Sequence, residues 1–164
     1  MPIEPVVVKI RRMPEFDDLP LPQYMTPGAA GADLVAALTE PLTLLPGARA
    51  LVPTGLTLEL PEGYEAQIRP RSGLALEHGL TLLNAPGTID SDYRGPVGLI
   101  VVNHGDAPHT IRRGDRIAQL VVAPVVRASF ATARFLASSH RDAGGFGSTD
   151  GRPVAKSAPR NDPA

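Results

Sequence analysis

The sequence contains no cysteine and no tryptophan, and aromatic residues make up only 4% of it. Without cysteine the chain has no disulfide, no thiol nucleophile and no thiolate zinc site. Because aromatic residues are so scarce, valine, leucine, isoleucine and alanine must fill the hydrophobic core. Any nucleophile or zinc ligand among the side chains must therefore be an oxygen or nitrogen group.

Long apolar runs and an excess of one charge are missing as well. No run of about 18 apolar residues predicts a membrane span, and the opening "MPIEPVVVKIRR" lacks the apolar stretch of a signal peptide. The net charge of −1 gives no overall basic field for a long polyanion, so we expect no nucleic-acid partner. A few arginines can still bind one small anion. We expect a cytoplasmic protein with no membrane partner.

Proline and glycine, in contrast, are abundant. The 18 prolines and 16 glycines form about a fifth of the 164 residues, which is typical of a rigid, turn-rich β protein of one domain. Short apolar runs recur with turn signals between them, the pattern of a β-sandwich or barrel. We expect strands at residues 6–10, 32–36, 48–53, 56–60, 64–70, 97–103, 109–113 and 116–126.

One short helix is expected at residues 72–80, in "SGLALEHGL". Ser72 is a candidate N-cap, and Gly79 is a candidate residue to end the helix. Arg69 and Arg71 alternate out of the strand before it. Because a helix N-terminus favours phosphate, Arg71 and Ser72 form a candidate phosphate site. Taken alone, the motif is explained more simply by a capped helix with a solvated arginine.

The chain changes character at "RDAGGFGSTD", residues 141–150. Glycine N–H groups can form an anion-binding nest, and Arg141 adds a planar fork suited to phosphate oxygens. Ser148 and Thr149 add hydroxyl donors. Phe146 has no core of its own to join, so it is a candidate to stack on a base. By composition alone, a flexible tail is the simpler interpretation.

Isolated polar residues complete the pattern. Asp33 begins a strand after glycine, and Gln119 interrupts an apolar strand, so a buried Gln119 must find hydrogen-bond partners. Taken alone, Asp33 is explained by a turn aspartate that bonds to the neighbouring backbone, and Gln119 is explained by a structural hydrogen bond. The segment "NAPGTIDSDYRG" carries Asp90, Asp92 and Tyr93 between turn residues. Together these signals favour a nucleoside polyphosphate with Mg²⁺, which stays on the phosphates and needs no dense carboxylate cage.

The order of these motifs resembles the trimeric dUTPases, the dUTP pyrophosphatases, from about residue 6 to 151. Five segments occur in family order: "AGADL" (30–34), "PRSGLA" (70–75), "NAPGTIDSDYRG" (84–95), "RGDRIAQLV" (113–121) and "RDAGGFGSTD" (141–150). The resemblance implies an all-β jelly-roll or β-barrel protomer of the dUTPase-like β-clip type, with one short helix. It also implies a homotrimer closed by a C-terminal lid. We expect a β domain at 1–140, a glycine-rich lid at 141–151 and a disordered tail at 152–164.

The resemblance also implies an activity. It predicts Mg²⁺-dependent attack of water on the α-phosphate of dUTP, giving dUMP and pyrophosphate, which keeps uracil out of DNA and supplies dUMP for dTMP synthesis. Asp90 would activate the water. The hairpin with Asn84, Thr88 and Ile89 would bind uracil through its main chain. Tyr93 would lie against the deoxyribose, and we interpret Asp92 as hairpin support.

The remaining residues that the resemblance assigns would hold the phosphates or cover the base. Asp33 would support Mg²⁺ indirectly, through water. Asp142 stands where the family commonly has glycine, which adds a negative charge beside the phosphate clamp. The substrate-binding residues outside the hairpin are Arg71, Ser72, Gly73, Gln119, Arg141, Phe146, Gly147, Ser148 and Thr149.

Two alternatives remain open at this point. The dCTP deaminases share the fold, but they typically carry a second serine and a nearby arginine in the second motif and a catalytic glutamate after the hairpin. Here Gly73 follows Ser72, and "GPVGLIVVN" contains no acid; a zinc deaminase is excluded because it needs cysteine. A non-catalytic nucleotide-binding trimer is possible on the fold alone. The presence of Asp90, Ser72 and the Arg141–Phe146 segment favours an enzyme.

Overall fold

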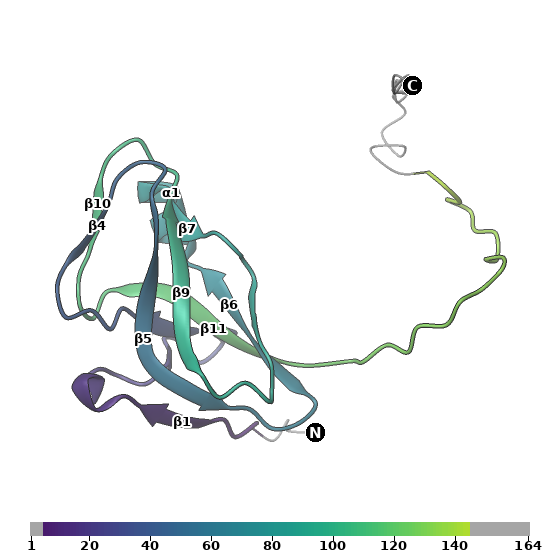
Figure 1. Ribbon diagram of the computed structural model, residues 1–164, viewed down its shortest axis with the longest axis horizontal. Helices are drawn as coiled ribbons and strands as arrows, with labels where there is room; N and C mark the ends of the chain where they lie inside the picture. The colour runs from purple at the N-terminus through teal and green to yellow at the C-terminus, as the bar shows by residue number, and fades with distance from the viewer. Residues whose placement is uncertain (1–4, 145–164) are drawn as a thin grey trace, which may run out of the picture. The chain divides into compact units, whose positions relative to one another are not determined.

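The computed structural model describes residues 5–144 (Figure 1). Its contacts divide the chain into two units, Met1–Arg127 and Ala128–Ala164. The first unit contains every strand and helix of the described residues, and residues 128–144 of the second have none. Within residues 5–144, no helix has the length and apolar character that crossing a membrane requires.

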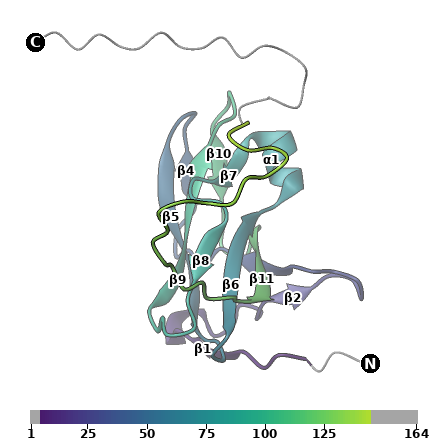
Figure 2. The same ribbon diagram turned by 90° about the vertical axis from the view of Figure 1, so that its right-hand side faces the viewer.

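Antiparallel sheets form the first unit. One sheet has the order β1-β5-β9-β7, with β1 at Lys9–Arg12, β5 at Arg49–Glu59, β9 at Pro96–Asn103 and β7 at Leu80–Leu82. A second has the order β2-β3-β11-β6-β8, with β2 at Gln23–Tyr24, β3 at Ala32–Val35, β11 at Arg116–Pro124, β6 at Tyr64–Pro70 and β8 at Gly87–Ile89 (Figure 2). Strands β4 (Leu42–Leu44) and β10 (His109–Ile111) pair separately, and the helices are η1 (Pro14–Phe16) and α1 (Ser72–His78). The predicted all-β fold with one short α-helix is confirmed.

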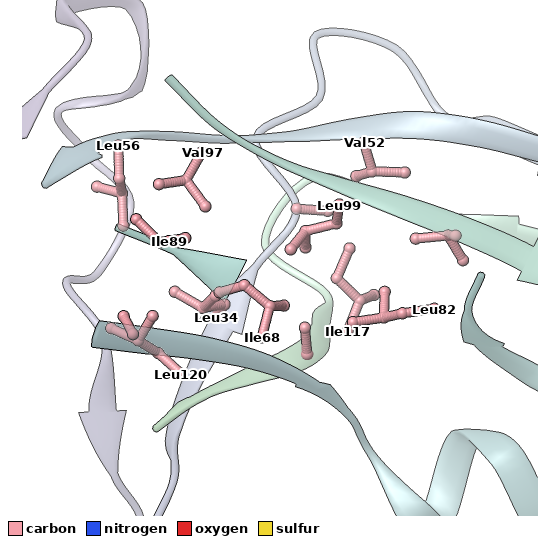
Figure 3. Close-up of a cluster of buried hydrophobic side chains, with 14 of the residues drawn as sticks. Leu34, Val52, Leu56, Ile68, Leu82, Ile89, Val97, Leu99, Ile117 and Leu120 are labelled. Carbon is pink, nitrogen blue, oxygen red and sulfur yellow. The ribbon is translucent and has the colours of Figure 1, made fainter. Parts of the chain in front are cut away.

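The main core lies between the four-stranded and five-stranded sheets. Successive side chains of a strand point to opposite faces, so Ala66 and Ile68 of β6 are buried while Gln67 between them is not. Figure 3 shows Val52 and Leu99 of one sheet in the same cluster as Ile68 and Leu120 of the other. Burying each large aliphatic side chain contributes about 1.5–3 kcal/mol. These aliphatic contacts therefore fix the two sheets that carry the candidate site.

Two predicted strands, 48–53 and 56–60, prove to be the single strand β5. The prediction of a break was wrong because Gly55 adopts a φ of +69° inside the strand, where it bends the chain without ending it. The pairing of β5 with β9 shifts register between Pro53 and Thr57, across this glycine. Gly55, which the sequence pattern places at a turn between two strands, thus lies at a bulge within one strand.

Four strands were not predicted: β2, β4, β7 and β8. Each has only two or three residues, too few to show an alternating pattern. Strand β1 starts at Lys9, later than the predicted residue 6. The omission matters most for β8, because this strand carries part of the candidate pocket.

Helix α1 occupies almost the predicted range. Gly79 follows it in the left-handed conformation, with a φ of 67°, and its N–H donates to the carbonyl oxygen of Ala75, so the predicted C-terminal signal is confirmed. The predicted N-cap was wrong. Arg71 occupies the N-cap position in an extended conformation without a side-chain cap, and Ser72 is the first helical residue. Strand β6 runs to Pro70, which leaves Arg71 as the only residue between strand and helix.

Candidate functional site

The predicted hairpin forms one wall of a pocket. Residues 84–93 contribute part of the lining, and strand β9 contributes residues 96–100 opposite them. The pocket volume of about 190 Å³ is below the roughly 300–1,000 Å³ of sites for drug-sized ligands, so it accommodates one small group of a ligand. The lining residues are Ile68, Leu82, Asn84, Gly87, Thr88, Ile89, Asp90, Tyr93, Pro96, Val97, Gly98, Leu99 and Ile100. The structure thus brings together all five hairpin residues predicted to bind or process the substrate.

Tyr93 is held at the mouth of this pocket by its own hairpin. Its hydroxyl donates to the carbonyl oxygen of Pro96 at 3.1 Å, and its backbone N–H donates to the carbonyl oxygen of Asp90 at 3.2 Å. A side chain at Gly95 would collide with the tyrosine ring, so glycine is required there for this placement. Tyr93 remains 45% exposed, which leaves part of its surface available to a ligand.

The two acids of the hairpin differ in position. Asp90 follows β8 directly and lines both the hairpin pocket and a neighbouring hollow, whereas Asp92 lines only that hollow. Arg94 closes the turn by donating from one Nη1 to the carbonyl oxygens of Ser91, at 2.6 Å, and of Tyr93, at 2.9 Å. Arg94 was absent from the predicted site, and its only sequence signal is its place before Gly95. Asp90 is therefore the carboxylate available to the pocket.

A second polar group, the Asp33 cluster, lies on the outer face of the five-stranded sheet. We define it as Asp33, Arg71, Arg116 and Gln119. Asp33 is buried, with 4% of its side chain exposed, and its Oδ1 accepts from Nε2 of Gln119 at 3.1 Å. Its Oδ2 lies 3.2 Å from Nη1 of Arg116 and 3.6 Å from Nη2 of Arg71. Gln119 therefore has the partner that its place in an apolar strand demanded.

A β-bulge brings Arg116 into this cluster. Arg116 pairs with Val35 and Ala118 pairs with Leu34, so one extra residue, Ile117, stands between them. The bulge reverses the direction of Arg116 relative to Ala118, which points into the core, and aims it at Asp33. The carbonyl oxygen of Arg116 also accepts from Nη1 of Arg71 at 2.8 Å. Arg116 was not among the predicted site residues, because no sequence signal marks the bulge.

The hairpin pocket and the Asp33 cluster do not share a cavity within the described residues. None of Asp33, Arg71, Ser72, Gly73 and Gln119 lines the hairpin pocket. Ser72 and Gly73 begin α1 and are exposed. Within the described residues, the predicted phosphate-binding side chains therefore lie outside the pocket that the predicted base-binding residues line.

The predicted lid begins in the second unit. Arg141 donates from Nε to the carbonyl oxygen of Gly144 at 2.6 Å, and the N–H of Gly144 donates to the carbonyl oxygen of Arg141 at 2.9 Å. Asp142, the departure from the family pattern, has a φ of 45°. The lid residues Phe146, Gly147, Ser148 and Thr149 lie outside the described residues, as does the tail at 152–164.

The described residues offer no ready-made metal cage: they contain no group of three or more histidine or acidic side chains that could hold an ion. Both carboxylate oxygens of Asp33 already have guanidinium or amide partners. This donor set fits Mg²⁺ only as an ion that arrives on phosphates and keeps its waters. Asp33 could reach such an ion through water, since a carboxylate has about four acceptor sites.

The geometry agrees with comparisons to known proteins. A family model described as dUTPase matches residues 17–150. The chain is 63% identical over 146 residues to a deoxyuridine 5'-triphosphate nucleotidohydrolase of Anaeromyxobacter sp. (strain Fw109-5), covering 88% of this chain and 98% of that relative. The chain belongs to the dUTPase family. The resemblance inferred from its five motifs is confirmed, and this dUTPase is a hydrolase of nucleotide metabolism.

Solved structures support the fold of this dUTPase. A mutant dUTPase of Staphylococcus bacteriophage 80alpha, solved with dUpNHpp, matches with a TM-score of 0.77 at 23% identity, covering 87% of this chain and 98% of that one. A mutant dUTPase of phage phi11 of S. aureus, described with a structural Mg(II) ion, matches with a TM-score of 0.70 at 22% identity, covering 80% and 99%.

Proposed function

We propose that this dUTPase hydrolyses dUTP to dUMP and pyrophosphate, with the uracil and deoxyribose in the hairpin pocket. The main support for this proposal is the pocket itself, which is small and is lined by hairpin residues that include Asn84 and Tyr93. Backbone N–H and C=O groups next to the pocket can read the edge of a pyrimidine. The fixed hydroxyl of Tyr93 places its ring where it can lie against the deoxyribose and exclude a 2′-hydroxyl.

Asp90 is the proposed general base. It is exposed and lines the pocket, so it can accept a proton from a water molecule next to the substrate. The water oxygen forms a bond to the α-phosphorus, and the bond from that phosphorus to the bridging oxygen breaks. Pyrophosphate leaves with the electron pair, and Asp90 takes the proton of the water.

The Asp33 cluster is the proposed phosphate site. Asp33 holds Arg116, Arg71 and Gln119 in place before a ligand arrives, and such preorganised donors stabilise developing phosphate charge. Ser72 and Gly73 follow directly, with exposed hydroxyl and backbone donors. Mg²⁺ bound with the triphosphate would neutralise part of its charge, and Asp33 would support that ion through water.

The proposed assembly is a homotrimer. Among the residues that the structure describes, the hairpin pocket of one chain contains none of the predicted phosphate-binding side chains, which favours a site completed by a surface of another chain. A three-fold assembly supplies three such composite sites, each using the hairpin of one copy and the Asp33 cluster of a neighbour. Residues 141–151 would close over the site as a lid, with Phe146 on the uracil and Arg141, Gly147, Ser148 and Thr149 on the terminal phosphate. We place this enzyme in the cytoplasm, where its substrate is made.

The deciding assay is pyrophosphate release from dUTP with Mg²⁺, run beside dCTP, dTTP and UTP. Turnover of dUTP alone is the expected result, because the proposed binding mode leaves no room for a thymine methyl and sets Tyr93 against a 2′-hydroxyl. Ammonia released from dCTP would instead identify a deaminase. Binding of dUTP without turnover would identify a nucleotide-binding protein that has no catalysis.

The lid is tested by truncation before Arg141. We expect the truncated chain to keep its oligomeric state by light scattering and to lose most of its dUTP turnover. A matched truncation at Gly151 removes only the residues after the lid and is expected to retain activity. Full activity after removal of residues 141–164 would contradict the lid.

A further inference from the structure

Arg69 is a charged residue of the described site region to which the proposed function gives no role. It lies on β6, directly opposite Gln119 of β11, and Gln119 lies directly opposite Asp33 of β3. Residues paired across antiparallel strands point to the same face, about 4.5–5.5 Å apart at Cβ. Asp33, Gln119 and Arg69 therefore form one cross-strand row on the outer face of the five-stranded sheet.

The charges along this row are unbalanced. Arg71 and Arg116 both pair with Asp33, which is the only carboxylate in an ion pair with either of them in residues 5–144. Arg69 adds a third guanidinium and, in the same part of the chain, forms no ion pair. Three guanidinium groups thus stand with Asp33 at this end of the face, and the one acid of β6, Glu65, lies four residues from Arg69 along the strand. The surplus favours binding of a polyanion at this face.

The resting contact of Arg69 is with a neutral group. Its Nη2 and Nε donate to Oε1 of Gln67 at 2.7 Å and 3.2 Å, and Nε2 of Gln67 donates to Oε1 of Glu65 at 2.7 Å. These three side chains stand at alternate positions of β6, on its outer face. The amide thereby keeps the guanidinium on this face without cancelling its charge. A phosphate oxygen is a stronger acceptor for a guanidinium than an amide oxygen.

We propose that Arg69 is an additional substrate-binding residue, which leaves Gln67 and binds a phosphate oxygen of the polyphosphate. It would act beside Arg71 and Gln119 and favour the triphosphate over the monophosphate. The inference rests on the proposed function, because it takes the Asp33 cluster as the phosphate site. It adds a contact from a strand position outside the five motif segments.

The test compares the affinities of the non-hydrolysable dUpNHpp and of dUMP for the full-length protein. We expect Arg69→Gln to weaken dUpNHpp binding by about tenfold, the scale of one charge-assisted hydrogen bond, and to leave dUMP binding within about twofold. The weakening should shrink as salt is raised, since the lost term is electrostatic. The matched control is Arg49→Gln, an exposed strand arginine on the four-stranded sheet, which should change neither affinity.

A second variant separates phosphate binding from a merely structural role of the polar row. Gln67→Leu removes the resting partner of Arg69 and leaves its charge, so dUpNHpp affinity should be unchanged or higher. If Arg69 only stabilised β6, Gln67→Leu and Arg69→Gln would lower the unfolding temperature together and leave dUpNHpp affinity intact. Unchanged dUpNHpp binding by Arg69→Gln would overturn this inference alone. Failure of the unmodified protein to bind dUpNHpp would overturn the proposed function.

Discussion

The hairpin pocket and the Asp33 cluster are assembled in opposite ways. Most of the pocket comes from one continuous stretch, residues 84–100, in which Arg94 and Tyr93 bond to neighbours one to three positions away. The Asp33 cluster joins residues that are 83 and 86 positions apart in the chain. Local turn chemistry shapes the first, whereas sheet register and a bulge create the second. A substitution in one region should therefore impair ligand binding there and leave binding at the other region intact.

The largest expected effect comes from Asp90→Asn, which removes the proposed base from the hairpin pocket. Turnover should fall by about 10²–10⁴-fold, the usual contribution of a general base, while dUpNHpp binding is retained. Single-turnover kinetics and calorimetry measure the two quantities. Asp92→Asn is the matched control, since Asp92 lies outside the pocket, and should keep near-normal turnover. Normal turnover by Asp90→Asn would remove Asp90 from the mechanism.

Asp33→Asn should impair the Asp33 cluster and leave the hairpin pocket unaltered. It removes the negative charge that holds Arg116 and Arg71, so affinity for dUpNHpp should fall by roughly tenfold to hundredfold, with a hydrogen bond to a charged group contributing about 1.5–3 kcal/mol. Affinity for dUMP should change much less, because the hairpin pocket is unaltered. An equal loss for both ligands would show that the two regions are coupled, contrary to the comparison.

Gly95→Ala should impair the hairpin pocket and leave the Asp33 cluster unaltered. The added methyl group collides with the ring of Tyr93 and displaces it from the carbonyl oxygen of Pro96. We expect about a tenfold loss of dUMP affinity, because overpacking of this kind costs roughly 1–3 kcal/mol. Binding of inorganic pyrophosphate should be unchanged, since the Asp33 cluster is intact. A loss of pyrophosphate binding would show that the hairpin shapes both regions.

The smallest expected effect is a pH dependence of stability, caused by a histidine that lies in neither the hairpin pocket nor the Asp33 cluster. Burial, and then the charge of His78, lower the pKa of His109, whose ring centroid lies 4.5 Å from that of His78, while Asp115 opposes the shift. Because the pKa is lower in the folded state, the unfolded state binds more protons. Stability should therefore fall as the pH drops through the unfolded value near 6.5.

This pH effect is modest, because His109 is only partly buried and solvent screens its charge. Thermal unfolding at pH 7.5 and pH 5.5 measures it, and His109→Gln should flatten the difference. The ratio of dUMP to dUpNHpp affinity should be the same in His109→Gln as in the unmodified protein. A change in that ratio would connect α1 and β10 to the site.

The sequence by itself determined the fold class, the helix ending at Gly79 and the five hairpin residues that meet in the hairpin pocket. These features depend on residues close together in the chain, where alternation, a left-handed glycine and turn residues act locally. The family also followed from the sequence, because five motifs in order identify it even though each is weak alone. The strands of two or three residues were missed, since they are too short to show a period.

The tertiary structure alone decided which distant groups meet. Nothing near Arg116 in the sequence indicates that an extra residue at Ile117 turns it toward Asp33. Likewise, no local pattern indicates that Asn103 is fully buried and donates to the carbonyl oxygens of Leu44 and Ala107. Register between strands far apart in the chain sets these contacts, and burial of the aliphatic faces fixes that register. The Asp33 cluster, the proposed phosphate site, follows from this pairing, and its contacts could not be assembled from the motifs alone.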